Sequence, residues 1–239
     1  MADFRFNRSE RMNAIIVIPT YNEKDNIRPL VEEIFKVVPD IKILIVDDNS
    51  PDGTGKIADE LSKRYGQVKV LHREKNEGLG RAYIAGFKEA LKMNPDYILQ
   101  MDADFSHHPK YIPLFLKENA NCDIVLGSRF LNVKGHPLSI SALSLWANRY
   151  VKLILGLKVT DSLGGFKCFR RRVIEDIDLD KFMSRGFIFQ AELSYRAFKN
   201  NCLFREIPIM FYSRKSGFSK KSKRIILEAF FKTLLFRLL

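Results

Sequence analysis

The sequence is short of the features that mark several common protein classes. Its three cysteines, Cys122, Cys168 and Cys202, are widely spaced and form no C-x-x-C pair. We therefore expect buried thiols in a reducing compartment, and neither a disulfide framework nor a zinc site. The first 13 residues are polar and charged, so we expect no signal peptide. The apolar C-terminal stretch, residues 225–239, contains charges and is shorter than the ~20 residues of a membrane span.

Two common nucleotide-binding motifs are also missing. No G-x-G-x-x-G follows the first predicted strand, which argues against a dinucleotide cofactor, and no G-x-x-x-x-G-K-[ST] occurs, which argues against a P-loop. The sequence has no internal repeat and no low-complexity linker. A chain of 239 residues is long enough for one full core.

Hydrophobic patterning predicts an α/β fold. Short β-branched runs, typical of buried parallel strands, alternate with segments whose apolar residues recur at helical spacing. The predicted strands of this first part are residues 14–19, 42–47, 69–72 and 97–101, and the predicted helices are 25–38, 56–65 and 81–93. This alternation indicates a doubly wound, mostly parallel sheet flanked by helices. It loosens further on, where we predict helices at 109–119, 140–157 and 189–199 and strands at 123–126 and 204–212, with a turn into a strand at 164–169.

The stretch around Asp102 and Asp104 carries the strongest chemical signal. If the preceding apolar run is a buried strand, side chains two apart point to the same side, and Asp102 and Asp104 leave its C-terminal end together. Two adjacent carboxylates suit a hard divalent cation and, through it, a diphosphate. For the Asp-x-Asp motif alone, a solvated strand exit is the more frequent explanation.

Two further acidic loops follow predicted strands. Tyr21 and Glu23 come after the first, where a ring beside a carboxylate suits stacking on a base and hydrogen bonding to ribose. Asp48 comes after the second, at the place where nucleotide-binding folds hold a ribose. A polar turn and a helix-capping loop are the alternatives. Three acidic strand ends in a protein of net charge +12 favour metal–nucleotide binding.

Together these motifs resemble family-2 inverting glycosyltransferases of the GT-A fold, and within them the dolichyl- or polyprenyl-phosphate mannose synthases. The resemblance covers nearly the whole chain from Ala14 onward. It rests on PTYNE at 19–23, DDNSPDGT at 47–54, NEGLG at 76–80, DAD at 102–104 and GSR at 127–129, with later matches at 161–167, 185–187, 190–192 and 217–220. The second of these motifs, combined with the last segment, is the most specific to polyprenyl-phosphate enzymes.

The resemblance implies transfer of mannose from GDP-mannose to a polyprenyl or dolichyl monophosphate, with inversion. It assigns nucleobase and ribose binding to Pro19, Tyr21, Glu23, Val46 and Asp48. It assigns the diphosphate and a Mg²⁺ or Mn²⁺ ion to Asp102, Ala103 and Asp104, and phosphate contacts to Arg129, Arg214 and Lys220. Asp102, Asp104 and Arg129 are the expected catalytic residues.

The sequence departs from the family pattern at one position near the metal motif. Relatives often carry Gln two residues after the second Asp, whereas this chain has Ser106, a weaker metal ligand. The metal preference is therefore open. We expect His108 and Pro109 to open the next helix and His107 to be partly exposed.

The expected acceptor changes what catalysis requires. A phosphate monoester is already anionic near neutral pH, with a second pKa of about 6. It needs no carboxylate base, so positioning and charge neutralisation become the enzyme's main task. Basic residues near the site, Arg129 and Arg185 among them, fit this expectation.

The C-terminal residues predict a separate element. We expect a catalytic domain at 1–219 and a basic amphipathic helix at 220–239, with Lys220, Arg224, Glu228 and Lys232 on one narrow face. Its wide apolar face suits an anionic membrane surface or a docking partner such as a membrane subunit, and packing on the protein's own core is the alternative. Residues 140–157 form either a second wall for the lipid or core. We expect a peripheral protein on the cytoplasmic face of a membrane.

Other functions stay open on the sequence alone. The same transfer from UDP-glucose is a close rival, because one sequence does not identify the base-reading residues. A nucleotidyltransferase would share the metal site. A basic nucleic-acid-binding module would explain the net charge, but the positive residues gather near the C-terminus among apolar ones, so we expect no nucleic-acid partner.

Overall fold

The computed structural model describes residues 13–131, 142–211 and 223–238. At its centre lies one seven-stranded sheet in the order β3-β2-β1-β4-β6-β5-β7. The strands are β1 Ala14–Thr20, β2 Lys42–Asp47, β3 Val68–His72, β4 Tyr97–Gln100, β5 Ile124–Ser128, β6 Lys167–Arg170 and β7 Phe204–Pro208.

The sheet is mostly parallel, as the sequence predicts. Strands β1 to β4 run in one direction, and β5 pairs in parallel with β7. Only β6 is antiparallel, to β4 on one side and to β5 on the other. Every residue of β1 is buried, because helices cover both faces of the sheet at its centre.

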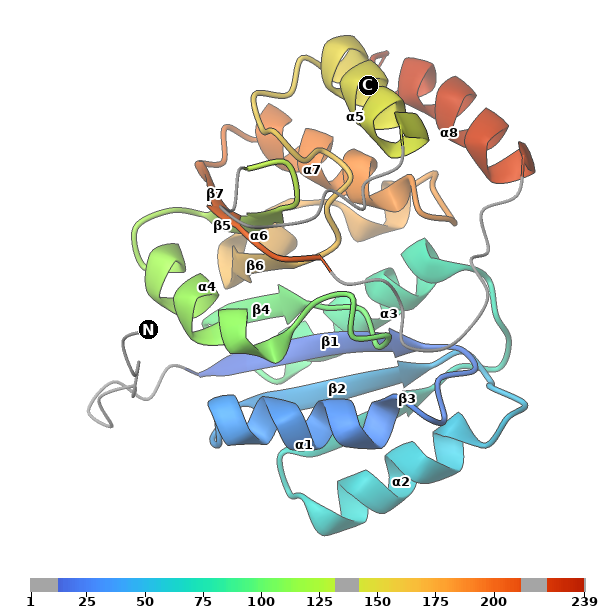
Figure 1. The fold of residues 1–239 in the computed structure, drawn as a ribbon, viewed down its shortest axis with the longest axis vertical. Helices are drawn as coiled ribbons and strands as arrows, with labels where there is room; N and C mark the ends of the chain where they lie inside the picture. The colour runs from blue at the N-terminus through green and yellow to red at the C-terminus, as the bar shows by residue number, and fades with distance from the viewer. Residues whose placement is uncertain (1–12, 132–141, 212–222, 239) are drawn as a thin grey trace.

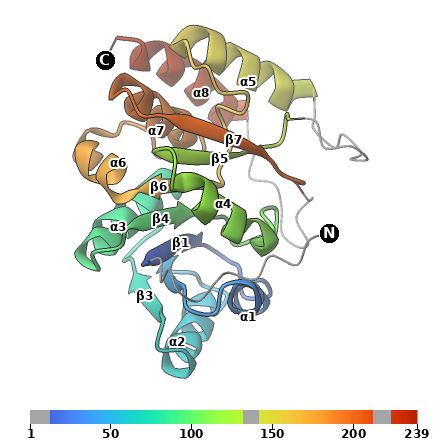
Figure 2. The same ribbon diagram turned by 90° about the vertical axis from the view of Figure 1, so that its left-hand side faces the viewer.

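Helices form a layer on each face (Figures 1 and 2). Alternate β1 residues divide between the two layers, since Ile16 and Ile18 pack on the side of α1, α2 and α4, whereas Ile15 and Val17 pack on the side of α3, α6 and α7. The helices are α1 Ile27–Val37, α2 Thr54–Arg64, α3 Leu79–Lys92, α4 Ile112–Asn119, α5 Ala142–Leu155, α6 Arg171–Asp176, α7 Phe189–Lys199 and α8 Lys223–Phe236, with short 3₁₀ turns at Pro109–Tyr111 and Leu179–Lys181.

Helices α5 and α8 lie together at one end of the molecule, beyond β5 and β7 (Figures 1 and 2). They enclose a smaller apolar cluster with α7, in which Leu155 and Phe236 are completely buried. Tyr150 on α5 stacks on Phe230 of α8, with ring centroids 4.8 Å apart. This corner is therefore attached to the rest of the protein through α7 and its own small core.

Candidate active site

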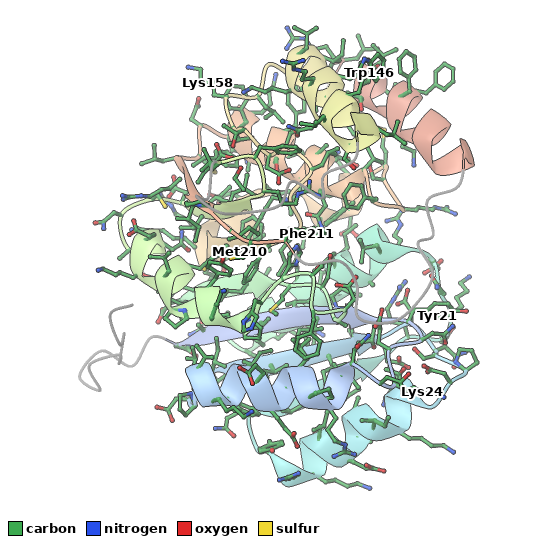
Figure 3. The ribbon with its side chains drawn as sticks, in the orientation of Figure 1. Tyr21, Lys24, Trp146, Lys158, Met210 and Phe211 are labelled. Carbon is green, nitrogen blue, oxygen red and sulfur yellow. The ribbon has the colours of Figure 1, made fainter. Side chains whose placement is uncertain are left out.

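The polar loops of the predicted site follow parallel strands and meet at one edge of the sheet. The loops after β1 and β2 are joined by the Asp48 backbone N–H, which donates to the Thr20 carbonyl (3.0 Å). Tyr21 and Lys24 lie beyond the ends of these strands in Figure 3. This edge is where open α/β sheets bind their ligands.

The loop after β2 holds the loop after β1. Side-chain oxygens of Ser50, Asp52 and Thr54 accept the backbone N–H groups of Asn22, Lys24 and Glu23 at 3.1, 3.2 and 2.9 Å, in that order. Buried Asp47 folds its own loop by accepting from Ser50 Oγ (2.6 Å). Several polar residues of the DDNSPDGT motif thus serve to shape this edge of the sheet.

Asp48 is buried and forms an ion pair with Arg73 (2.6 Å), which comes directly after β3. The Arg73 guanidinium also reaches Glu77 (2.8 Å). Burial raises the pKa of Asp48, and the arginine opposes that rise. Arg73 therefore belongs to the site, although sequence reasoning did not single it out. The signal available was its place directly after the third predicted strand.

The strand before Asp102 ends earlier than predicted. β4 stops at Gln100, and Asp102 to Ser106 form an irregular loop, which we call the acidic loop. Phe105 in this loop adopts a positive φ of 61°. The alternation of side chains along a strand therefore does not place the two acids, and that part of the prediction is wrong. Instead, Asp102 Oδ1 accepts from the Tyr83 hydroxyl (3.1 Å), and Asp104 Oδ1 accepts from the Ser106 N–H (3.0 Å).

His107 is 3% exposed, which corrects the prediction that it is partly exposed. Its ring stacks on Phe166, with centroids 5.1 Å apart, and its Nδ1 accepts from the Asp102 N–H (3.3 Å). Burial lowers the pKa of His107, so its imidazole is neutral and holds the loop through this hydrogen bond to Asp102. His108 does open the next turn, as predicted, by accepting from the Lys110 N–H (3.2 Å).

The two acids suit a hard divalent cation. No group of three or more His, Cys, Asp or Glu residues that could hold a metal occurs in the described ranges. Mg²⁺ in nucleotide sites is usually held by one or two carboxylates together with substrate phosphates and water, so two acids are sufficient. The Asp102 side chain is 29% exposed, and Asp104 is 4% exposed. Asp102, Asp104 and Ser106 would hold such an ion.

Arg129 lies just after β5 in a two-point contact with the fully buried Asp161. The distances are 2.7 Å from Nε to Oδ2 and 2.8 Å from Nη2 to Oδ1. The guanidinium also lies over the Phe211 ring, 5.3 Å from its centroid, and that ring meets His107 edge-on. Burial lowers the pKa of Arg129, but its bonds to Asp161 outweigh this effect and raise it. The arginine is thus a fixed cation beside the acidic loop.

The loop that carries Asp161 is itself held from two sides. Glu206 on β7 accepts from the Thr160 and Asp161 N–H groups, at 2.7 and 3.0 Å. Asn148 on α5 accepts from the Ser162 N–H (2.9 Å). Asp161 lies in one of the motifs of the resemblance, but its role as the partner of Arg129 was not predicted, because the contact spans 32 residues.

The NEGLG loop approaches the segment before α7. Gly80 donates its N–H to the Arg185 carbonyl (2.8 Å), and a Cβ at Gly78 would lie 2.5 Å from that same oxygen. Gly78 also has a φ of +100°. The motifs at 76–80 and 185–187 therefore meet through their backbones. The Arg185 side chain itself is exposed.

The remaining predicted residues have mixed positions. Tyr21 and Glu23 are half-buried at the edge, whereas Pro19, Val46 and Ala103 are buried, and Val46 packs in the core beside α3. Arg214 and Lys220 lie outside the described residues.

The outer surface of α5 and α8 is unusually apolar. Trp146, Leu153, Phe231 and Leu238 are 66%, 80%, 61% and 83% exposed. We call the following residues the α5–α8 face: Leu143, Leu145, Trp146, Leu153, Phe230, Phe231, Leu234, Leu235 and Leu238. Within the described part of the chain, no helix is long and apolar enough to cross a membrane.

Sequence comparison identifies the family. The profile described as Glycosyl transferase family 2 matches residues 15–178. The chain is 40% identical over 223 residues to the polyprenol monophosphomannose synthase of Mycolicibacterium smegmatis, covering 91% of this chain and 84% of that protein. The chain belongs to glycosyl transferase family 2 and is a glycosyltransferase. Its similarity within that family is to polyprenyl-phosphate mannosyltransferases, since the undecaprenyl-phosphate mannosyltransferase of Micrococcus luteus is 38% identical, covering 91% of each chain.

Structure comparison agrees on the fold. The glucosyl-3-phosphoglycerate synthase of Mycobacterium tuberculosis, solved in complex with Mn²⁺, UDP and its product, superposes with a TM-score of 0.68 at 15% identity, covering 95% of this chain and 80% of that one. The predicted GT-A fold and the predicted family are both confirmed.

Proposed function

We propose that this chain transfers mannose from GDP-mannose to a polyprenyl monophosphate with inversion, giving polyprenyl-phosphate mannose. The observation that carries the proposal is the Asp102–Asp104 loop beside the Arg129–Asp161 pair on the ligand-binding edge of the sheet. The two relatives, each about 40% identical over most of the chain, support mannose as the sugar and a polyprenyl phosphate as the acceptor.

The reaction balances without a protein base. An oxygen of the acceptor phosphate forms a bond to C1 of mannose while the bond from C1 to the diphosphate oxygen breaks, and GDP leaves. The acceptor enters as an anion, so no proton has to be removed. The task of the protein is to align the two phosphate-bearing groups and to stabilise the leaving charge.

Each site residue then has a role. Pro19, Tyr21, Glu23, Val46 and Asp48 form the nucleoside end, with Arg73 fixing the Asp48 carboxylate. Asp102, Ala103, Asp104 and Ser106 hold the diphosphate end, where a bound Mg²⁺ or Mn²⁺ would neutralise charge on the leaving group. Arg129, kept in place by Asp161, attracts an incoming phosphate, and Arg214 and Lys220 add positive charge from the segment before α8.

The lipid acceptor requires access to a membrane, and the α5–α8 face offers it. A groove between the two helices is lined by apolar side chains such as Leu153 and Phe231, with Arg237 among them. Arg149 on α5 is also exposed. Apolar residues next to cations suit the interface of an anionic bilayer. The chain would then act as a peripheral enzyme at the cytoplasmic face, and a membrane subunit seated on this face is the alternative occupant.

Asp104→Asn tests the proposal while keeping the oxygen that accepts from Ser106. Transfer of labelled mannose from GDP-mannose to membrane polyprenyl phosphate should fall by about two to three orders of magnitude. Asp25→Asn, on the exposed approach to α1, is the matched control and should be fully active. Normal lipid product from Asp104→Asn would refute the assignment. A glucosyl lipid made from UDP-glucose, with no mannosyl lipid, would favour the rival donor.

A further inference from the structure

A lysine that has no carboxylate of the described residues in hydrogen-bonding reach is buried next to the acidic loop. Lys167 on β6 is 0% exposed. Its Nζ donates to the Gly164 carbonyl (2.6 Å) and to Gln190 Oε1 (2.8 Å), and it lies 3.5 Å from the Gln190 carbonyl. Burying an ammonium group that has only neutral partners is costly, so such a residue usually has a functional reason to remain.

The surrounding amides are arranged around this cation and are incompletely satisfied. Gln100, the register partner of Lys167 on β4, donates Nε2 to Gln190 Oε1 (2.5 Å) and to the Gly165 carbonyl (2.8 Å). Gln100 Oε1 and Gln190 Nε2 are buried without a hydrogen-bond partner among the described residues. Native proteins rarely leave two such atoms unpaired in one cluster, which again points to a site under functional constraint.

Gly165 connects this cluster to the acidic loop. A Cβ built on it would lie 3.5 Å from Asp102 Oδ2, 3.2 Å from His107 Cε1 and 3.6 Å from Gln190 Nε2. The cluster of Gln100, Lys167 and Gln190 therefore lies one glycine away from the Asp102 carboxylate. Burial lowers the pKa of Lys167 to about 7, whereas the charges of Asp161 and Asp102 act to raise it and so favour its protonated form.

We propose that Lys167, oriented by Gln190 and the Gly164 carbonyl, is a positioning residue that supplies a buried positive charge beneath the diphosphate of the donor. Lys167 acts by its electrostatic field and by holding the Gly164–Gly165 segment in place. It does not touch the substrate. This proposal rests on the proposed function and adds to it a residue for which the phosphate chemistry described above has no role.

The test compares ligands that differ in phosphate charge. Lys167→Met keeps the length of the side chain and removes its charge. Affinity for GDP with Mg²⁺ or Mn²⁺, measured by titration calorimetry, should fall about tenfold, as expected for a charge several ångströms from a diphosphate. Guanosine binding, followed by ligand-observed NMR, should not change. The thermal midpoint of unfolding should be equal or higher, because the cost of burying the ammonium is gone.

Three further variants separate the explanations. Gln190→Glu keeps Lys167 but neutralises it with a carboxylate, so it should weaken GDP selectively as well. Lys199→Met, at the exposed end of α7, removes the same formal charge and should bind like the wild type. Asp104→Asn tests the metal–diphosphate site itself.

The outcomes distinguish failure of this inference from failure of the proposed function. If Lys167→Met and Gln190→Glu bind GDP as the wild type does, or lose guanosine and GDP equally, the buried charge has no role toward phosphate and the inference is wrong. That result leaves the proposed function intact as long as Asp104→Asn abolishes GDP binding. If the wild type itself binds no metal–GDP, it is the proposed function that fails.

Discussion

The two ends of this molecule distribute their apolar residues in opposite ways. Around β1 to β4 the apolar side chains are inside, and the exposed edge is built from acids, amides and hydroxyls that are paired with one another. On α8 the order is partly reversed, since the polar Thr233 is buried whereas the apolar Phe231 and Leu234 face outward. Trp146 and Tyr21, one from each region, lie far apart along the long axis in Figure 3.

The difference indicates which ligand each end is suited to meet. Polar groups that are already fixed by hydrogen bonds cost little to align with a nucleotide, so the first region is preorganised for a charged, water-soluble donor. Exposed apolar surface is unfavourable in water, and large patches of it mark sites where a partner or a membrane binds. The asymmetry therefore matches an enzyme that takes one substrate from water and the other from a membrane.

The largest expected effect comes from breaking the apolar end alone. In Leu153→Glu combined with Phe231→Glu, binding to anionic vesicles, measured by co-sedimentation, should weaken about a hundredfold or more, because each side chain contributes about 1.5–3 kcal/mol when buried. GDP affinity should not change. Leu203→Glu, at a leucine that is 60% exposed outside the α5–α8 face, is the control and should bind vesicles normally. Full vesicle binding by the double variant would instead favour a protein partner on this face.

A second substitution should damage only the polar end. Gly78→Ala meets the Arg185 carbonyl at 2.5 Å and also requires a φ of +100°. We expect a loss of about 2–3 kcal/mol in the free energy of unfolding, measured with urea, together with reduced transfer activity.

Two other glycines resolve the origin of that loss. Gly53→Ala shares a positive φ of 94° but meets nothing within 4 Å, so it reports the conformational cost alone. Gly66→Ala has open space and no positive φ, and it should be neutral or slightly stabilising. Equal losses at Gly78 and Gly53 would show that the contact with Arg185 contributes nothing.

A smaller effect is expected at the nucleoside end. Arg73→Met removes the partner of the buried Asp48 carboxylate. We expect the KM for GDP-mannose to rise about tenfold with a smaller change in kcat, because in the proposed function Arg73 acts through Asp48 on the nucleoside end of the donor. Arg64→Met, at an arginine that is 60% exposed, is the control. A fall in kcat with no change in KM would contradict this role.

The sequence predicted the parts of this structure that depend on local pattern. Strand β2 and helix α7 begin and end where hydrophobic periodicity places them. The same reasoning failed at Asp102 and His107, because the loop after β4 is shaped by Tyr83 and Phe166, which are distant in sequence. The contact of Asp161 with Arg129 was missed for the same reason, since the two residues lie on different segments of the chain.

The smallest expected effect tests the buried imidazole beneath the acidic loop. Burial lowers the pKa of His107 below its usual 6.5, so the unfolded chain binds a proton there before the folded protein does. The contribution of His107 to stability is therefore present above pH 6.5 and is lost as the pH falls from 6.5 toward its folded pKa.

Between pH 7 and pH 5.5, wild type should lose about 1 kcal/mol more unfolding free energy than His107→Gln. Parallel pH profiles of wild type and His107→Gln would mean that the imidazole is hydrated in solution, and that the polar end is less preorganised than its hydrogen bonds indicate.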